Sequence, residues 1–178
     1  MRSSLKKTFS VLFVVIAVVL LSACSHIAAP RGPIPVKMEV VGPIQGGKEV
    51  AFENGVTDAG LTLVAVQGSN KWWVDYKMWT GSVVSQLETE LRNRGLEVKS
   101  ESEKSFRVRV ESVGLFWGSF STRCIVKVRV EKKDGSWSKT YEGNNPSPAS
   151  LYRSIDGAVY RAVVAILSDN DFRRTLTQ

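Results

Sequence analysis

Hydrophobic and polar residues alternate along several short segments of the chain. Within residues 106–111, Phe106, Val108 and Val110 alternate with charged residues, and within residues 124–131 the same period of two recurs. A period of two places successive side chains on opposite faces of a strand, so each segment has one apolar face and one mostly charged face. This pattern is typical of an antiparallel sheet that is covered on one side. Weaker patterns of the same kind predict further strands at residues 36–40, 49–53, 61–67 and 137–141.

Two other segments carry apolar residues at helical spacing. We expect the first helix over residues 80–94, with Thr80 as its N-cap and Gly95 as the left-handed residue that ends it. The second helix should span residues 148–167 and begin after Ser147. Small residues in this second helix would let it approach a sheet closely, and they are Gly157, Ala158, Ala162 and Ala165.

The predicted elements follow one another as strands, helix, three strands and helix. This order predicts an α+β fold, a two-layer sandwich in which two helices pack on one face of an antiparallel sheet. Residues 36–178 have the length of one such domain, and no internal repeat is evident in them. We therefore expect a single α+β domain.

The N-terminal residues have a different pattern, which is typical of a secretory signal peptide. Arg2, Lys6 and Lys7 make the first residues positive, and residues 11–21 form an uninterrupted apolar run of 11. A helix needs about 20 apolar residues to cross a bilayer, so this run is too short for a permanent anchor. We therefore interpret residues 1–23 as a cleavable signal peptide.

The residues Leu21-Ser22-Ala23-Cys24 at the end of this segment resemble the lipobox of bacterial lipoproteins. The resemblance implies that Cys24 starts the mature chain, with diacylglycerol on its thiol and a fatty acid such as palmitate on its amine. In enterobacterial lipoproteins the absence of Asp after this cysteine, where Ser25 stands here, implies a place in the outer membrane, facing the periplasm. Three acyl chains would make the anchor permanent. The alternative is a soluble secreted protein that is cleaved near Ala23.

Residues 24–35 combine the lipobox cysteine with a proline-rich stretch that contains Pro30, Pro33 and Pro35. Proline disfavours helix and favours extended chain, so we expect a solvated tether. At about 3.1 Å per residue, it could hold the domain up to roughly 34 Å from the lipid headgroups. His26 lies in this tether, where we expect it to be solvated or in contact with headgroups.

The charge of the chain is basic but modest. The whole chain has 24 Lys and Arg against 17 Asp and Glu, and removal of residues 1–23 would leave 21 basic residues and a net charge of +4. Such a charge, in a protein exported from the cytoplasm, does not indicate a nucleic-acid partner. We expect a membrane and an envelope protein as partners, and we identify no small-molecule substrate.

Few residues of this chain suit catalysis or metal binding. Only one histidine is present, in the tether, and the second cysteine, Cys124, lies on the apolar face of a predicted strand. We expect Cys124 to be a buried structural residue, and we expect no catalytic residue, metal ligand or cofactor. An enzyme would need Glu111 or Asp156 in a polar pocket with a strongly perturbed pKa. We expect Asp156 to interact instead with residues one turn away, Arg153 or Tyr160.

Two clusters of aromatic residues complete the pattern. The first surrounds the start of the first helix, and we expect it to pack in the core; its members are Trp72, Trp73, Tyr76 and Trp79. The second lies in the connection between two strands, where exposed rings would form a contact patch for a partner or a membrane. Its members are Leu115, Phe116, Trp117 and Phe120.

Taken together, these features resemble the small YajG-type lipoproteins of bacteria. The lipobox, the helix that ends at Gly95, the strand pair and the closing helix toward Phe172 carry this resemblance. It implies a compact α+β domain with no established activity.

We therefore expect a non-enzymatic, lipid-anchored envelope lipoprotein that faces the periplasm and serves as a protein-interaction or assembly accessory domain. The main alternative is an accessory of lipid or lipopolysaccharide transport, similar to the LptE-type lipoproteins, which would require a groove or an exposed apolar patch. A cell-wall hydrolase is a third hypothesis, and it would require the polar pocket named above.

Overall fold

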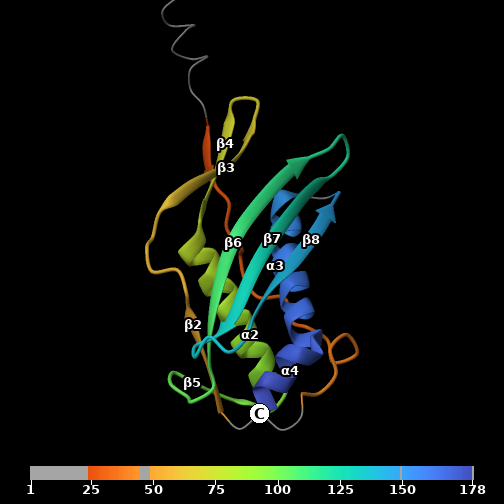
Figure 1. The fold of residues 1–178 in the computed structure, drawn as a ribbon. Coiled ribbons are helices and arrows are strands. Elements are labelled where there is room, and N and C mark those ends of the chain that lie inside the picture. Colours follow the sequence, from red (N-terminus) through yellow and green to blue (C-terminus); the bar gives the residue numbers. More distant parts are fainter. Residues whose placement is uncertain (1–23, 45–48, 149, 178) are drawn as a thin grey trace, which may run out of the picture.

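The structure, a computed structural model, describes residues 24–44, 49–148 and 150–177. The predicted signal peptide, residues 1–23, lies outside the described residues. Within them the chain forms eight strands and three helices, which confirms the predicted α+β class (Figure 1).

The large sheet has five strands and carries the core. Its strands β6, β7 and β8 are antiparallel, as predicted, whereas β2 runs parallel to both of its neighbours, so the whole sheet is mixed. Parallel neighbours need a long crossover connection, and the chain between β2 and β5 supplies it. In spatial order the strands are β5 (Glu97–Lys99), β2 (Glu49–Asn54), β6 (Ser105–Trp117), β7 (Thr122–Lys132) and β8 (Ser138–Ser147).

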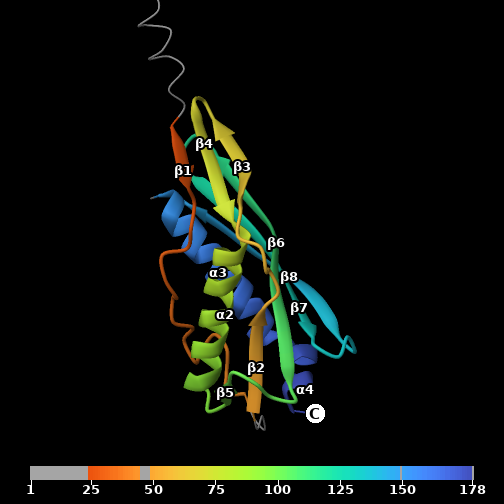
Figure 2. The same ribbon diagram turned by 90° about the vertical axis from the view of Figure 1, so that its left-hand side faces the viewer.

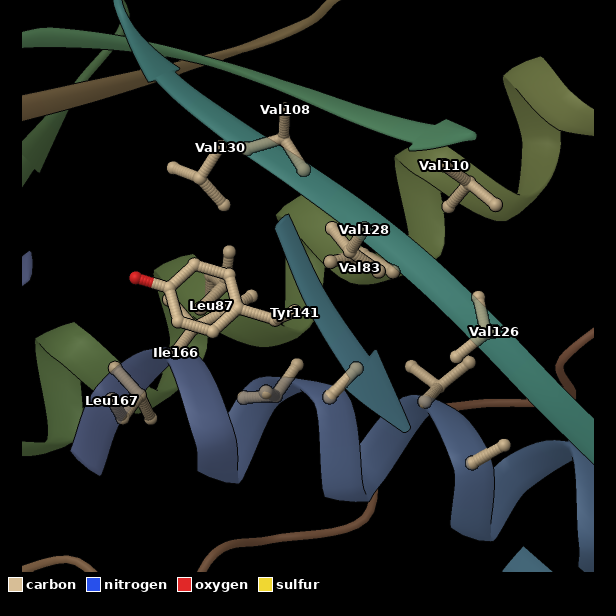
Figure 3. Close-up of a cluster of buried hydrophobic side chains, with 14 of the residues drawn as sticks. Val83, Leu87, Val108, Val110, Val126, Val128, Val130, Tyr141, Ile166 and Leu167 are labelled. Carbon is tan, nitrogen blue, oxygen red and sulfur yellow. The ribbon is translucent and has the colours of Figure 1, made fainter. Parts of the chain in front are cut away.

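Two long helices, α2 (Tyr76–Asn93) and α3 (Leu151–Ser168), cover one face of the large sheet (Figure 2). The apolar residues of β6 and β7 point toward them, and alternate residues are buried as the period of two predicted. Figure 3 shows this layer between sheet and helices, with Val83, Leu87, Val108, Val126, Val128, Val130, Ile166 and Leu167 among its fully buried side chains. A short helix, α4 (Asn170–Thr177), follows α3.

The packing of α3 on β8 depends on small residues. A Cβ atom added at Gly143 would lie 1.9 Å from the carbonyl oxygen of Ala158, so β8 touches the helix backbone directly. Ala162 is fully buried at the same contact. The predicted close approach of this helix is therefore confirmed.

A second, small sheet lies at the end of the molecule away from the C-terminus (Figures 1 and 2). Its strand order is β1 (Ser25–Ile27), β4 (Asn70–Asp75) and β3 (Leu61–Gln67), with β1 parallel to β4 and β3 antiparallel to it. The turn between β3 and β4 contains Gly68 at φ +58°, a conformation that favours glycine. The strands before the first helix thus divide between two sheets.

The start of α2 differs from the prediction. The helix begins at Tyr76, and its N-cap is Asp75, whose Oδ1 accepts a hydrogen bond from the Met78 backbone at 3.1 Å. Thr80 lies inside the helix, fully buried, and its hydroxyl accepts a hydrogen bond from the Val110 backbone of β6 at 3.0 Å. Thr80 is therefore a bridge to the sheet and not a cap. The end of the helix is as expected, because Gly95 has φ +86°.

The strand that we predicted at residues 36–40 is wrong, because this segment is a loop and turn. Two buried charged residues, one in α2 and one at its C-cap, hold the backbone of this loop. Glu90 accepts a hydrogen bond from the Val36 backbone at 2.9 Å, while Arg94 donates to the carbonyl oxygens of Val36 and Val41. Glu90 and Arg94 also pair with each other, 2% and 1% exposed.

The tether that we expected at residues 24–35 is packed against the domain. The Ala28 carbonyl accepts a hydrogen bond from the Trp79 indole at 2.8 Å, and the Ile34 carbonyl accepts one from Gln86 at 2.8 Å. Ala28 itself is fully buried. The proline-rich segment avoids helix as predicted, but polar side chains of α2 hold it, so the folded domain already begins at β1.

Candidate functional site

Cys24 lies at the outer end of the small sheet. It is exposed, and its carbonyl accepts a hydrogen bond from the Lys71 backbone at 2.9 Å. The strand β1 begins at the next residue, and its pairing continues with His26 opposite Trp72. The residue predicted to carry the lipid is thus joined to the fold without a spacer.

A row of stacked rings connects this sheet to β6. The His26 and Trp72 ring centroids are 4.5 Å apart and nearly parallel, at 23°, and the Trp72 and Trp117 centroids are 5.6 Å apart. His26 Nε2 also lies 3.1 Å from the Asn70 side-chain oxygen. His26 is thus not fully solvated as one part of our expectation had it, because its ring is half-buried and stacks on Trp72 of β4. Its contact with headgroups stays a prediction. The core packing expected for the first aromatic cluster is confirmed for Trp79, which is fully buried. Trp72 and Tyr76 are half-buried against the core, and Trp73 is half-buried outside it.

The residues of the predicted contact patch do not share one surface, because neighbouring residues of β6 point to opposite faces of the sheet. Leu115 is 5% exposed and faces the core, and Trp117 is half-buried against Trp72, so these two residues do not belong to an exposed patch. Phe116 points to the other face and is 52% exposed, while Phe120 in the β6–β7 turn is 92% exposed. Of the four predicted residues, the structure thus leaves Phe116 and Phe120 in contact with solvent.

The β6–β7 turn holds these two rings in a defined way. The Gly118 backbone donates a hydrogen bond to the Ser121 carbonyl at 2.8 Å, which closes the turn. The Phe116 ring lies over Gly114, where a Cβ atom would come within 2.8 Å of it. A hollow of about 360 Å³ opens beside Phe116, and Arg123 lines its other side.

The strand β3 forms an exposed apolar edge that the sequence analysis did not single out. Leu61, Leu63 and Val66 are 53%, 43% and 59% exposed. Within the described part of the chain, β3 pairs on one side only, with β4. None of its seven residues is charged. Edge strands commonly carry charges that prevent further pairing, so the lack of charge was the sequence signal that could have pointed to a contact edge here.

The face of the large sheet opposite the helices is charged. Arg107 contacts Glu53 at 2.8 Å and Glu131 at 3.0 Å, and Arg129 contacts Glu131 at 3.2 Å. Partial desolvation opposes ionisation of Glu131, but the hydrogen bonds from Arg107 and Arg129 outweigh it and lower the pKa of this carboxyl. The same face therefore presents paired charges of both signs.

Glu111, one of the two candidate acids, lies on this face. It accepts a hydrogen bond from Thr140 at 3.2 Å and lines a polar hollow of about 280 Å³ together with Arg109 and Arg129. The hollow is lined by two glutamates and three arginines, and none of these residues is a nucleophile of the kind that a neighbouring base activates.

Asp156, the other candidate acid, does not bind Arg153 or Tyr160 as we predicted. Both of its carboxylate oxygens accept hydrogen bonds from Arg31, through the backbone at 3.0 Å and through the guanidinium at 2.8 and 3.1 Å. Arg31 lies in the N-terminal segment, 125 residues away in sequence. Asp156 therefore fastens that segment to α3.

Cys124 is fully buried in β7, which confirms its predicted location. Burial raises the pKa of its thiol to about 12, so the thiol stays protonated at neutral pH. Among residues 24–44, 49–148 and 150–177, no three His, Cys, Asp or Glu side chains come together as metal ligands would. The helices of the same ranges include none that is long and apolar enough to span a bilayer.

Three comparisons with known proteins give few matches. No protein-family model matches the chain, and no curated protein matches it in sequence. A solved structure described as "Crystal structure of uncharacterized protein" aligns with a TM-score of 0.43 and 13% identity, over 86% of this chain and 99% of that chain.

Proposed function

We propose that this chain is a lipid-anchored envelope protein, fixed through acyl groups on Cys24 to the periplasmic face of the outer membrane. It acts without catalysis, as an interaction domain for another envelope protein. The single observation that carries the anchor is the contrast between its two cysteines. Cys24 is exposed at the end of β1, whereas Cys124 is buried with a raised pKa, so Cys24 is the thiol that a modifying enzyme can reach.

Replacement of Cys24 tests the anchor. In cells fed with labelled palmitate, Cys24→Ala should abolish the label and leave the precursor uncleaved, because the thiol that receives the diacylglycerol is gone. Cys124→Ala is the matched control and should keep both labelling and cleavage. Labelling of Cys24→Ala at the wild-type level would contradict the proposal.

The exposed edge of β3 supports the interaction function. A strand with one unpaired side can accept an extended segment of another protein, whose backbone supplies hydrogen bonds while its side chains meet Leu61 and Leu63. The absence of charge in β3 removes the usual obstacle to such pairing. The partner we propose is therefore an envelope protein with an extended apolar segment.

Site-specific crosslinking tests the interaction. A photoreactive residue at Leu63 should capture one discrete envelope protein in cells, and the same protein should appear when the probe is at Leu61. The control position is Ser136, exposed in the turn between β7 and β8, where no such product is expected. Equal capture from Ser136, or no product from β3, would contradict the proposal.

We prefer this function to the two alternatives for structural reasons. Lipid transport would require an apolar groove or an exposed apolar patch. The space between the large sheet and its helices is filled by buried side chains, and we assign the exposed apolar residues of β3 to a protein partner because the unpaired side of this strand can accept an extended segment. A further hollow, about 680 Å³ between β2 and residues 100–105, is lined mainly by polar residues such as Glu53 and Ser102. A hydrolase would use Asp156 or Glu111, and Asp156 is already engaged by Arg31.

A further inference from the structure

We propose that the end of the molecule that carries Cys24 lies directly on the bilayer, with the β6–β7 turn inserted among the lipid headgroups through Phe120. This inference rests on the proposed acylation of Cys24. It goes beyond anchoring, because an anchor alone would leave the orientation of the domain free.

The first support is the missing spacer. The Cys24 carbonyl is hydrogen-bonded to the Lys71 backbone, and β1 begins at Ser25. Acyl chains attached to the Cys24 sulfur therefore start one side chain away from the small sheet. A solvated tether of the length first expected could have lifted the domain by tens of ångströms, whereas this arrangement keeps the end of the sheet at the headgroups.

The second support is the position of the β6–β7 turn. In both ribbon views this turn, the β3–β4 turn and the start of β1 lie at the same end of the molecule, away from the C-terminus (Figures 1 and 2). Cys24 directly precedes β1. The Trp72–Trp117 contact joins the small sheet to the end of β6. A flat surface that touches the anchor point can therefore also touch the turn.

The third support is the chemistry of the turn. Residues 118–121 read Gly-Ser-Phe-Ser, so the turn carries no charge, and its one large side chain, Phe120, is 92% exposed. An aromatic ring gains from leaving water at the membrane interface, and small polar neighbours remain hydrated among headgroups. The turn thus has the composition of an interfacial insertion.

Cations surround the same end and favour anionic headgroups. Arg123 stands opposite Phe116 in the register of β6 and β7, and Lys71 stands opposite Ser25. Both side chains are exposed, and neither forms an ion pair with another described residue. Lys and Arg near a membrane surface are attracted to anionic lipids.

The test uses the lipidated full chain reconstituted into phosphatidylethanolamine–phosphatidylglycerol vesicles. Ser119→Cys is labelled with an environment-sensitive fluorophore, since Cys24 carries lipid and Cys124 is buried, and quenching by spin-labelled lipid is measured. We expect quenching at least threefold stronger at position 119 than in Ser136→Cys at the opposite end. Adding Phe120→Ser should reduce the quenching at position 119 at least threefold.

The outcomes separate this inference from the anchor. If mass spectrometry finds acylated Cys24 but position 119 is quenched no more than position 136, the docked orientation is wrong and the anchor stands. An unmodified Cys24 thiol would overturn both. If strong quenching at position 119 persists in the Phe120→Ser background, Phe120 does not make the membrane contact, and the proposed insertion through Phe120 is contradicted.

Discussion

The two sheets of this molecule differ in what covers them. On the large sheet, α2 and α3 cover one face, and residues such as Val128 and Leu87 have no contact with solvent. No described helix covers the small sheet in the same way, and β3 leaves Leu61 and Leu63 about half exposed. Exposing an apolar patch to water costs free energy, so such a patch commonly marks a surface that contacts a partner or a membrane. The large sheet thus holds most of the buried core, and the exposed residues of the small sheet and its neighbouring turn are the ones to which we assign contacts in our proposals.

A buried ion pair between Glu90 and Arg94 holds the N-terminal segment at Val36, and breaking this pair should have the largest effect on stability. Arg94→Leu leaves Glu90 buried without its partner and removes the donor to the Val36 carbonyl, so we expect a loss of about 3–5 kcal/mol. Urea unfolding measures it. The matched control is Arg92→Leu, which breaks an exposed pair with Glu88 on the same helix and should cost about 0.5 kcal/mol or less. Equal losses in the two variants would contradict the account.

Truncation of one leucine in each region tests the comparison itself. Leu87→Ala removes a fully buried side chain from α2 and should reduce the free energy of unfolding by about 2–5 kcal/mol. Leu63→Ala on β3, where the side chain is 43% exposed, should change it by about 0.5 kcal/mol or less. Thermal unfolding of the two variants gives the answer. A large loss of unfolding free energy in Leu63→Ala would show that this side chain is part of the core, and it would weaken the proposed role of β3 in binding.

The smallest effect concerns the turn at the end opposite Cys24. The Ser136 hydroxyl and backbone donate to Asp134 Oδ1 at 2.6 and 2.8 Å, and Ser136, with Lys132, lowers the pKa of Asp134 from 3.8 to about 2. Because the folded-state pKa is lowered, this contribution to stability is present above about pH 4 and is lost as the pH falls toward 2. Ser136→Ala should raise the pKa of Asp134 toward 3.8, as measured by NMR titration of the carboxyl group. An unchanged pKa would show that the hydroxyl does not hold the carboxylate. The β6–β7 turn, at the end of the molecule that carries Cys24, contains no charged residue. The two ends therefore differ in charge.

The sequence predicted those features that depend on local pattern. Alternation along β6 and β7 gave the correct buried face, including Cys124, because side chains of a strand alternate regardless of the rest of the fold. Gly95 ended its helix as expected, since positive φ is a local requirement. Beyond Val110 the alternation changes phase, because a bulge between Val110 and Ser112 inserts one residue into β6. Leu115 is therefore buried and Phe116 exposed, the opposite of what unbroken alternation would give.

Other features depend on contacts between residues far apart, and the sequence could not reveal them. Residues 36–40 alternate like a strand, but Glu90 and Arg94, 54 and 58 residues beyond Val36, bind their backbone. The proline-rich segment has the composition of a tether, yet Gln86 and Trp79 supply it with hydrogen bonds. These hydrogen bonds can be identified only when the position of α2 relative to the proline-rich segment is known.

The most direct test of the central claim is the mass of the N-terminal peptide of the mature protein, isolated from native membranes. The account predicts a chain that starts at Cys24, with diacylglycerol in thioether linkage to its sulfur and a fatty acid on its amine. A peptide that starts elsewhere, or one with an unmodified Cys24 thiol, would contradict it.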